Sequence, residues 1–355
     1  PAVARQIVDP RPATKGPGRR LRFAAGRKIL VVDDGSPFVS TIVTQLQHKG
    51  LDAQPLAADR VDQPDRFIGA GGLILGPATS PELAFLAAKH AAGELLQAAR
   101  GGDALFACLT RLDGAFGFTG NAFDDPVQGA LPGLVKTAAL EWRGVICRAI
   151  DLAPGFPDIE GAVQGFIDEL LQVSEHDPVE IGLGPDSRTI LCPVPAEVAG
   201  GTLQLNADDV LVITGGARGV TAACALAVAR QSNGAALALI GRSDAPFEIP
   251  AWLREISGEA AMKKAIIKHA FGGSHPTPKQ LEAEYRRQAA NLAIHQTLAA
   301  LAETGARAGY FKADVTDPES LAATLSAIRD KWGGITGLVH GAGVLHDRLI
   351  ADKSV

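Results

Sequence analysis

The residues best suited to chemistry form a glycine-rich turn, with the sequence Thr214, Gly215, Gly216, Ala217, Arg218, Gly219 and Val220. The turn follows an aliphatic run and precedes a helical pattern. Glycines there permit a tight bend and let a pyrophosphate approach the backbone, and the helix start offers free N–H groups. Because many glycine-rich turns only reverse the chain, this turn alone is weak evidence for a nucleotide site.

Three further motifs follow in the order that a dinucleotide site needs. The second aliphatic run ends in Gly241, Arg242 and Ser243, where an acidic residue would bind the ribose 2′-hydroxyl of NAD. Arg242 and Ser243 instead suit the 2′-phosphate of NADPH, since a guanidinium forks onto phosphate oxygens. Asp314 and Val315 are placed to face the adenine. The small residues after His340, namely Gly341, Ala342 and Gly343, leave room for the cofactor.

The first half of the chain carries a different turn at the matching place, Asp33–Phe38. Asp33 and Asp34 put negative charge where a phosphate would sit, and Phe38 replaces a glycine needed for close approach. Charge and bulk both oppose phosphate binding, so we expect this half to be a nucleotide-free scaffold.

Short aliphatic runs alternate with helical patterns along both halves, which predicts parallel sheets covered on both faces. We therefore expect an α/β fold of two tandem Rossmann-like units, the first degenerate and the second truncated at its C-terminus. The expected strands are 28–32, 72–75, 104–109, 145–150, 210–213, 235–240, 308–312 and 337–340, and the expected helices include 81–99, 126–141 and 318–332.

The expected domains are a linker over residues 1–27, a structural subdomain over 28–200 and a nucleotide-binding subdomain over 201–355. The run ILVVDDGSPFV from Ile29 aligns with VLVITGGARGV from Val210, and GLILGP is similar to GLVHGA. This similarity indicates an internal duplication, although any two strand–helix–strand units look somewhat alike. Both ends of the sequence resemble cuts inside a longer polypeptide.

A long helical insertion is expected over 244–305. Thr277, Pro278 and Gln280 form a helix start with a capping hydroxyl, and Gly305 ends the helix. Leu281, Tyr285, Leu292 and Leu298 supply an apolar stripe. The helix either packs on its own domain or serves as a docking or gating element.

Composition excludes several function classes. The net charge of −5 and the absence of a basic stripe argue against nucleic acid, and no apolar run reaches the ~18 residues of a membrane span. The four cysteines stand alone, which suits free thiols in a reducing cytoplasm and provides no metal site.

TGGARGVTA, GRS, DVTD and HGAGVL together resemble the short-chain dehydrogenase/reductase superfamily. More closely, they are similar to the ketoreductase domains of modular polyketide synthases and polyunsaturated fatty acid synthases. GLVKTAALEW and CRAIDL resemble the end of the structural half of such domains. Thr221 departs from the family, because many of these reductases have a third glycine there.

The resemblance implies an NADPH-dependent ketoreductase unit of a multidomain synthase. Its substrate would be a β-ketoacyl group on an acyl carrier protein, reduced to a β-hydroxyacyl group, and its partners would be that carrier and other synthase domains. Two alternatives remain open: a non-catalytic scaffold or nucleotide-binding module, and an extended short-chain epimerase or dehydratase. The last would normally have an acidic residue in place of Arg242.

The family's catalytic Ser, Tyr and Lys have no counterparts in this sequence. Tyr285 and Tyr310 are its only tyrosines, and Ala289 and Asp314 stand four residues after them, so neither begins a Tyr-x-x-x-Lys pair. Lys353 follows the turn at 341–343 but is expected on the loop directly after it, where it would not act in catalysis. We expect the catalytic residues downstream of Val355.

Overall fold

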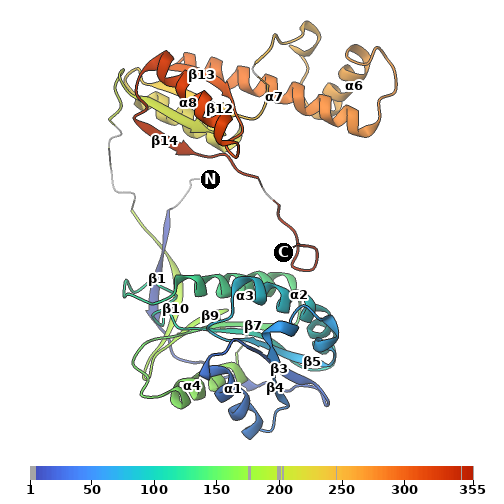
Figure 1. Ribbon diagram of the computed structural model, residues 1–355, viewed down its shortest axis with the longest axis vertical. Coiled ribbons are helices and arrows are strands. Elements are labelled where there is room, and N and C mark those ends of the chain that lie inside the picture. The colour runs from blue at the N-terminus through green and yellow to red at the C-terminus, as the bar shows by residue number, and fades with distance from the viewer. Residues whose placement is uncertain are drawn as a thin grey trace. The chain divides into compact units, whose positions relative to one another are not determined.

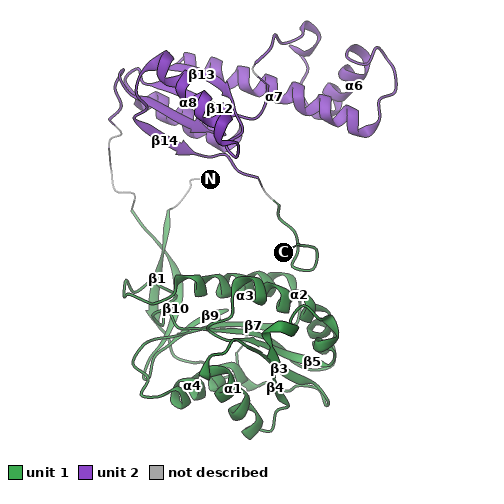
Figure 2. Cartoon of the chain, viewed as in Figure 1, with its two compact units in different colours: residues 1–198, 346–355 green, residues 199–345 purple. Residues whose placement is uncertain are grey.

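The computed structural model describes residues 5–174, 177–197, 201, 204–244, 246–344 and 346–354. These residues form two compact units, each with its own core and main sheet (Figure 2). Unit 1 comprises residues 1–198 and 346–355, and unit 2 comprises residues 199–345. Because unit 2 is inserted into unit 1 along the sequence, the chain passes between the units twice.

The main sheet of unit 1 has eight strands, and the six from β9 to β4 are parallel to one another (Figure 1). Its middle strands β5 and β6 are almost wholly apolar and buried along their whole length, as expected for a sheet covered on both faces. In spatial order the strands are β1 (Gln6–Pro12), β10 (Arg188–Pro195), β9 (Glu180–Leu183), β7 (Val145–Leu152), β6 (Ala104–Thr110), β5 (Ala70–Leu75), β3 (Lys28–Asp33) and β4 (Ala53–Ala57).

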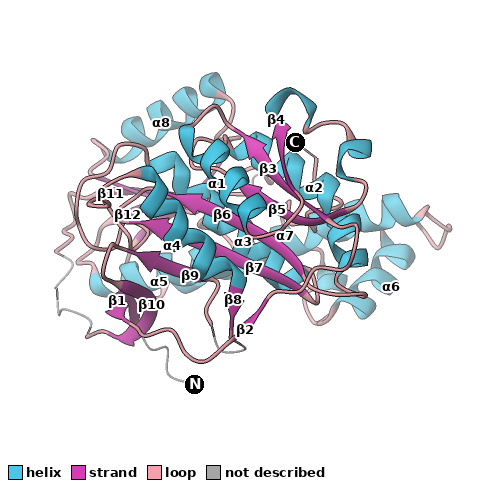
Figure 3. Ribbon diagram, turned by 90° about the horizontal axis from the view of Figure 1, so that it is seen from below, coloured by secondary structure: helices cyan, strands magenta, loops and turns pink. Residues whose placement is uncertain are grey.

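Helices cover both faces of this sheet. On one face, α2 (Pro81–Ala98) and α3 (Ala130–Glu141) pack over β5 and β6. On the other face lie α1 (Pro37–His48) and α4 (Ile159–Leu171), as the view in Figure 3 shows. Two helix starts use side-chain caps: Ser80 accepts from Leu83 N, and Asp158 accepts from Gly161 N.

The prediction that residues 1–27 form a linker is wrong for much of the segment. Strand β1 pairs antiparallel with β10 at the edge of the sheet, and its prolines are tolerated because an edge strand need not donate on its outer side. The prolines of β10, Pro193 and Pro195, lie beyond residues 188–190, where β10 pairs with β9. A short strand β2 (Arg19–Arg20) pairs with β8 (Gln172–Val173), and Leu21 is buried in the core. Arg19 also forks onto Asp103.

Residues 346–354 pack on unit 1, although the sequence placed them in the second domain. Ile350 is buried in the cluster beneath α2 and α3, and its N–H donates to Glu141 at 2.9 Å. Lys89 donates to the carbonyl of Lys353 at 2.7 Å. The burial of one aliphatic side chain explains why this segment joins the first unit.

Unit 2 contains a parallel four-stranded sheet in the order β13-β12-β11-β14. Helices α5 (Gly219–Gln231) and α7 (Pro278–Ala302) cover one face, and α8 (Pro318–Trp332) covers the other. The predicted α/β fold with parallel sheets is confirmed. The strands are β11 (Val210–Thr214), β12 (Ala236–Gly241), β13 (Arg307–Lys312) and β14 (Gly337–His340).

The insertion has a small core of its own. Helix α6 (Glu259–His269), which the sequence did not predict, packs with the first half of α7 around Met262 and Ile266. The predicted start of α7 is correct: Thr277 and Gln280 form a capping box, with Pro278 at the first helical position. The stripe divides between two cores, since Leu281 contacts the insertion cluster whereas Leu298 packs against the sheet.

Candidate nucleotide-binding site

A pocket of about 580 Å³ opens at the carboxyl ends of the strands of unit 2. In open α/β sheets ligands bind at such an edge, where the strand order reverses, and here the reversal falls between β11 and β14. Most of the sequence-predicted residues line the pocket: Gly215, Ala217, Arg218, Gly219, Gly241, Arg242, Ser243, Asp314, Val315, His340, Gly341, Ala342 and Gly343.

The glycine turn is shaped by a close approach between backbones. Gly215 has a φ of +70°, and a Cβ there would lie 2.7 Å from the carbonyl oxygen of Gly341. A Cβ at Gly216 would lie 2.6 Å from the Ile213 side chain. The absence of a side chain at Gly215 therefore lets the turn after β11 contact the turn after β14, and the two turns form one wall of the pocket. The absence of a side chain at Gly216 lets the turn fold back over Ile213.

Three of the predicted residues do not line the pocket. Thr214 is buried beneath it: its Oγ1 lies 2.8 Å from His340 Nδ1 and accepts from the N–H groups of Gly341 and Ala342 at 3.2 Å. Gly216 is also buried, whereas Val220 is 82% exposed on α5. Thr214 thus holds the turn after β14 in place.

The Arg242–Ser243 corner is held from below by Tyr310. The Tyr310 hydroxyl donates to the Ser243 carbonyl at 2.9 Å, and burial raises the pKa of that hydroxyl. A Cβ at Gly241 would lie 2.8 Å from the same hydroxyl oxygen. The backbone at the corner is therefore fixed, while the guanidinium groups of Arg242 and Arg218 stay exposed at the pocket rim.

Asp314 closes a local turn after β13. Its Oδ1 accepts from the N–H of Thr316 at 3.0 Å and from the Thr316 hydroxyl at 2.8 Å. The pKa of Asp314 lies below its usual range, mainly because of the hydrogen bond from the Thr316 backbone and then that from the Thr316 hydroxyl. The positive charge of Arg242 lowers it by a smaller amount. The carboxylate is therefore ionised at neutral pH and positions the backbone of Val315 along the pocket.

Sequence reasoning missed seven lining residues: Thr221, Ile240, Ile294, Tyr310, Ala313, Thr316 and Val344. Thr221 was noted only as a departure from a glycine. Its side chain packs on the turn after β14, because a Cβ at Gly341 would lie 2.5 Å from Thr221 Oγ1. Ile294 comes from α7, and no local sequence pattern shows that a helix after a long insertion returns to the pocket.

The matching turn of unit 1 is filled by its own carboxylates. Asp34 accepts from Ser36 N at 2.9 Å through Oδ1 and from Ala78 N at 2.7 Å through Oδ2, and Asp33 accepts from Gly35 N at 3.1 Å. Phe38 is buried there beneath the guanidinium of Arg111. The N–H groups of Gly35 and Ser36 in this turn are thus already bonded to aspartate oxygens.

Among the described residues, neither tyrosine hydroxyl is hydrogen-bonded to a lysine. Tyr310 is bonded to a backbone carbonyl, and Tyr285 packs in the insertion beneath Lys263. Lys353 lies on unit 1. The described residues contain no group of three His, Cys, Asp or Glu side chains that could hold a metal ion, and none of their helices is long and apolar enough to cross a membrane.

Comparison with known proteins places these features in a family. Residues 210–355 match the KR domain family. The chain is 31% identical to a polyunsaturated fatty acid synthase protein of Thraustochytrium sp. over 94% of its own length, which is 13% of that protein. It is 25% identical to polyketide synthase PksL of Bacillus subtilis over 65% of its length, or 4% of PksL.

Solved structures agree on the fold. An A-type ketoreductase from a modular polyketide synthase matches 99% of this chain and 67% of its own, with a TM-score of 0.57 and 21% identity. The first ketoreductase of the tylosin polyketide synthase matches 98% of this chain and 64% of its own, with a TM-score of 0.58 and 17% identity. Residues 210–355 thus belong to the KR domain family, and the chain as a whole is homologous to parts of polyunsaturated fatty acid and polyketide synthases.

Proposed function

We propose that unit 2 binds NADPH and that the chain forms part of a ketoreductase acting on β-ketoacyl groups carried by an acyl carrier protein. KR-type Rossmann domains depend on nicotinamide nucleotides. One observation carries the choice of NADPH: Arg242 and Ser243 end the second strand at the pocket rim, with Arg218 lining the same pocket. This corner offers cationic and hydroxyl donors to a 2′-phosphate, while the carboxylate of the adjacent Asp244 is paired with Lys312.

The residues of the pocket fit the parts of such a cofactor. The turn at 215–219 and the start of α5 would face the pyrophosphate with backbone N–H groups. Asp314 and Val315 would face the adenine, and the small residues after His340 leave room beside β14. When bound, the nicotinamide supplies a hydride to the substrate carbonyl carbon.

The carbonyl oxygen also needs a proton, and no tyrosine of this sequence stands four residues before a lysine. We propose that the Ser, Tyr and Lys of the family are supplied by residues that follow this sequence in a longer synthase. The chain spans 13% of the length of the fatty acid synthase protein it resembles, so other synthase domains are the proposed partners. A longer chain that includes both this sequence and those catalytic residues would reduce small β-keto thioesters with NADPH.

A nucleotide-binding module without catalysis is the second candidate, because the donor pair is absent from this sequence. Both candidates require cofactor binding, but only the reductase oxidises NADPH in the presence of a β-keto thioester. An assay of the chain extended by the residues that follow it distinguishes them. Oxidation dependent on the thioester supports the reductase, and cofactor binding without oxidation supports the module.

Calorimetry with Arg242→Ala tests the choice of cofactor. A guanidinium–phosphate bond contributes about 1.5–3 kcal/mol, so the variant should bind NADPH roughly 10- to 150-fold more weakly and NADH unchanged. Arg230→Ala is the matched control, since Arg230 is an exposed arginine at the end of α5 and does not line the pocket. Equal affinity of the unaltered chain for NADPH and NADH would rule the proposal out.

A further inference from the structure

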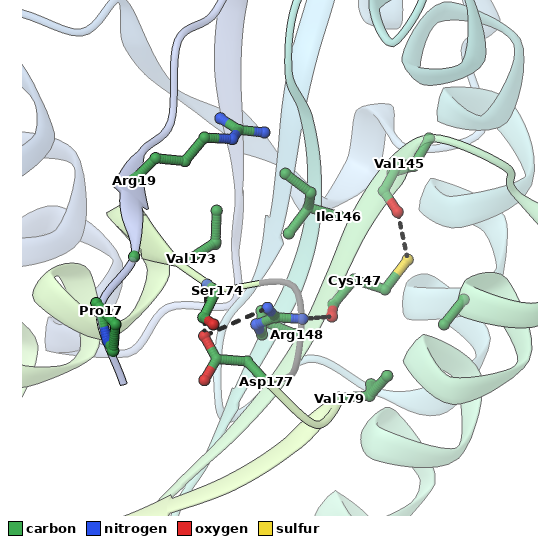
Figure 4. A pocket seen from close by; sticks show the side chains of 12 residues that line it. Pro17, Arg19, Val145, Ile146, Cys147, Arg148, Val173, Ser174, Asp177 and Val179 are labelled. Carbon is green, nitrogen blue, oxygen red and sulfur yellow. Dashed lines mark hydrogen bonds and ion pairs between the residues drawn. The ribbon is translucent and has the colours of Figure 1, made fainter. Parts of the chain in front are cut away.

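A hollow of about 760 Å³ in unit 1 lies at the amino end of β7 (Figure 4). Arg148 lies there 3.8 Å from Asp177, and Arg188 lies 3.1 Å from Asp177 and 3.2 Å from Glu169. The two buried arginines are balanced by the two carboxylates, so this hollow leaves no unmatched charge for a ligand. The structure instead leaves backbone donors unmatched in the glycine turn of unit 2.

These unmatched donors are two successive N–H groups of the turn. Among the described residues, the N–H groups of Ala217 and Arg218 have no hydrogen-bond acceptor. Both residues line the nucleotide pocket, directly before the start of α5. Backbone donors at a helix start are suited to an anion. Whether they can reach one depends on how the peptide between the two residues is turned.

Thr297 of α7 holds that peptide from outside the turn. Its hydroxyl donates to the carbonyl of Ala217 at 2.9 Å. A threonine inside a helix often donates to the carbonyl four residues before it, as Thr41 of α1 and Thr137 of α3 do. Thr297 instead bonds to a residue 80 positions away in the sequence. Its hydroxyl therefore acts on the turn and not on its own helix.

The bond from Thr297 sets the direction of the next N–H group. In a trans peptide the carbonyl and the following N–H point in opposite directions, and the described residues include no cis peptide. Because the carbonyl of Ala217 is turned toward α7, the N–H of Arg218 points away from that helix. The N–H is thereby kept from bonding to α7 and stays available to a ligand.

The matching carbonyl of unit 1 has a different partner. Ser36 aligns with Ala217, and its carbonyl accepts from the N–H of Val39 at 3.3 Å, inside its own turn. Within the described part of unit 2, Val220 makes no such bond to Ala217. The turn of unit 1 closes on itself, whereas that of unit 2 is held by a second helix.

Thr297 occupies a fixed place on α7. Ile294, one turn earlier, and Leu301, about one turn later, are both fully buried in the cluster beneath α5 and α7. Residues three and four apart share a helix face, so Thr297 lies between two buried anchors. Ile294 also lines the nucleotide pocket. This face of α7 is therefore positioned by the core of unit 2.

We propose that Thr297 is a positioning residue for the pyrophosphate of the cofactor. It turns the peptide between Ala217 and Arg218 so that the N–H of Arg218 can donate to a pyrophosphate oxygen. This inference rests on the nucleotide site proposed for unit 2 and adds to it a residue from the helix that follows the insertion. Arg242 acts on the 2′-phosphate, so the two residues act on different groups of the cofactor.

Thr297→Val tests the proposal, because valine keeps the shape of threonine but has no O–H donor. The affinities for NADPH and NADH should both fall roughly 3- to 10-fold, with their ratio unchanged, since both cofactors contain the pyrophosphate. Arg242→Ala should change that ratio instead. Adenosine 2′-monophosphate, which has no pyrophosphate, should bind the Thr297→Val chain as it binds the unaltered chain. Calorimetry measures the dinucleotides, and NMR titration measures the monophosphate.

Thr304→Val is the matched control. The Thr304 hydroxyl also donates to a backbone carbonyl, that of Leu301 at 2.7 Å, but Thr304 does not line the pocket. The control should therefore lose a comparable bond and keep the affinity for all three ligands. Thr297→Ser retains the hydroxyl and should bind both dinucleotides nearly as the unaltered chain does.

The outcomes distinguish this inference from the function on which it rests. Unchanged dinucleotide affinity in Thr297→Val would overturn the role of Thr297 and leave the site of unit 2 in place. An equal loss of adenosine 2′-monophosphate would also overturn it, because it would show a general weakening of unit 2. Failure of the unaltered chain to bind either dinucleotide would overturn the proposed function itself.

Discussion

The turns at 33–38 and 214–220 occupy matching places in the two units, but their backbone N–H groups have different partners. In unit 2, small residues leave the start of α5 facing a pocket, and Thr214 supports the wall from below. In unit 1, Asp34 binds two N–H groups itself, and a smaller hollow of about 290 Å³, lined in part by Phe38 and Arg111, remains beside them. We therefore expect the same strand–turn–helix to admit a phosphate in unit 2 and to exclude it in unit 1, where the chain supplies its own anion.

The two sheets also differ in whether a further strand follows the second strand of the unit, and this difference too favours a nucleotide site in unit 2. Unit 2 has β13 and α8 beyond β12, and Asp314 and Val315 follow β13. In unit 1 the strand β4 is the edge of the sheet, and two short 3-10 turns, Ala58–Arg60 and Pro64–Phe67, lead directly to β5. Unit 1 thus has no counterpart, within its described residues, to the wall that would face an adenine.

The largest effect is expected from Gly215→Ala. The substitution places a Cβ 2.7 Å from the Gly341 carbonyl and forces alanine to a φ of +70°, so two backbone segments of the pocket must separate. NADPH affinity should fall on the order of 100-fold, since the pyrophosphate needs the turn close to the helix start. Calorimetry measures this change, with hydrogen exchange to verify that unit 2 remains folded.

Gly35→Ala is the matched control in unit 1. Gly35 has a φ of +76°, but a Cβ there meets nothing within 4 Å. The variant should lose about 1 kcal/mol of stability from backbone strain and bind NADPH as the unaltered chain does. A comparable loss of NADPH affinity in both glycine variants would contradict the assignment of the cofactor to unit 2.

The next effect is on stability, from Asp34→Ala. The change leaves the N–H groups of Ser36 and Ala78 without their acceptor, which should lower the free energy of unfolding of unit 1 by about 2 kcal/mol. Urea unfolding measures this loss. Asp33→Ala, which removes one bond at an exposed position, should cost less than about 1 kcal/mol.

Asp34→Ala also tests whether unit 1 is closed to nucleotides by more than charge. Phe38 stays in place, so the variant should still bind one NADPH per chain. A stoichiometry of two in the variant, or in the unaltered chain, would show that the first turn accepts a phosphate after all.

The smallest effect concerns acid stability. Burial opposes ionisation of Asp113, but hydrogen bonds from Thr119, Gly117 and Ala115 outweigh it and hold the pKa of Asp113 below its usual range. A lowered folded pKa stabilises the fold above the unfolded pKa of about 3.9, and this contribution is lost as the pH falls through the folded value. Unit 1 should therefore weaken as the pH falls below about 4.

Substitutions at two aspartates separate the units in this respect. Asp113→Asn should flatten the decline of unit 1 in acid, measured by hydrogen exchange at a series of pH values below about 4. Asp314→Asn should change the acid dependence of unit 2 less, because the bonds of Asp314 lie at an exposed turn. Equal acid slopes for unit 1 with and without Asp113→Asn would refute the role of this carboxylate.

Much of the fold followed from local patterns. The buried strands were predicted because continuous aliphatic runs identify them. Helix α8 was predicted with its bounds, and the structure shows that Asp317 caps its start and Gly333 follows its end. Strand β1 was missed because its pairing partner lies near residue 190, and its prolines and charges suggest a linker. Pairing over such a distance leaves no local signal.

The residues of the candidate site also fall into those that the sequence predicted and those that it missed. Residues at strand ends were predicted because strand ends meet at one edge of a parallel sheet. Tyr310 and Ile294 were missed because their place in the pocket depends on tertiary packing from β13 and α7. The internal duplication stays a prediction: the turns correspond, but unit 1 lacks the edge strand of unit 2 among its described residues.

The return of the chain to unit 1 at Ile350 has a consequence for how the protein tolerates cleavage. Unit 2 is a loop whose two ends are both anchored in unit 1, one through β10 and the other through the buried Ile350. A single cut by a protease between β10 and β11 would break the covalent link there, and only the packing of residues 346–354 would then tie the two pieces together. Burial of one isoleucine contributes about 1.5–3 kcal/mol, far less than the roughly 8 kcal/mol of a micromolar complex, so the cut pieces should separate in dilute solution.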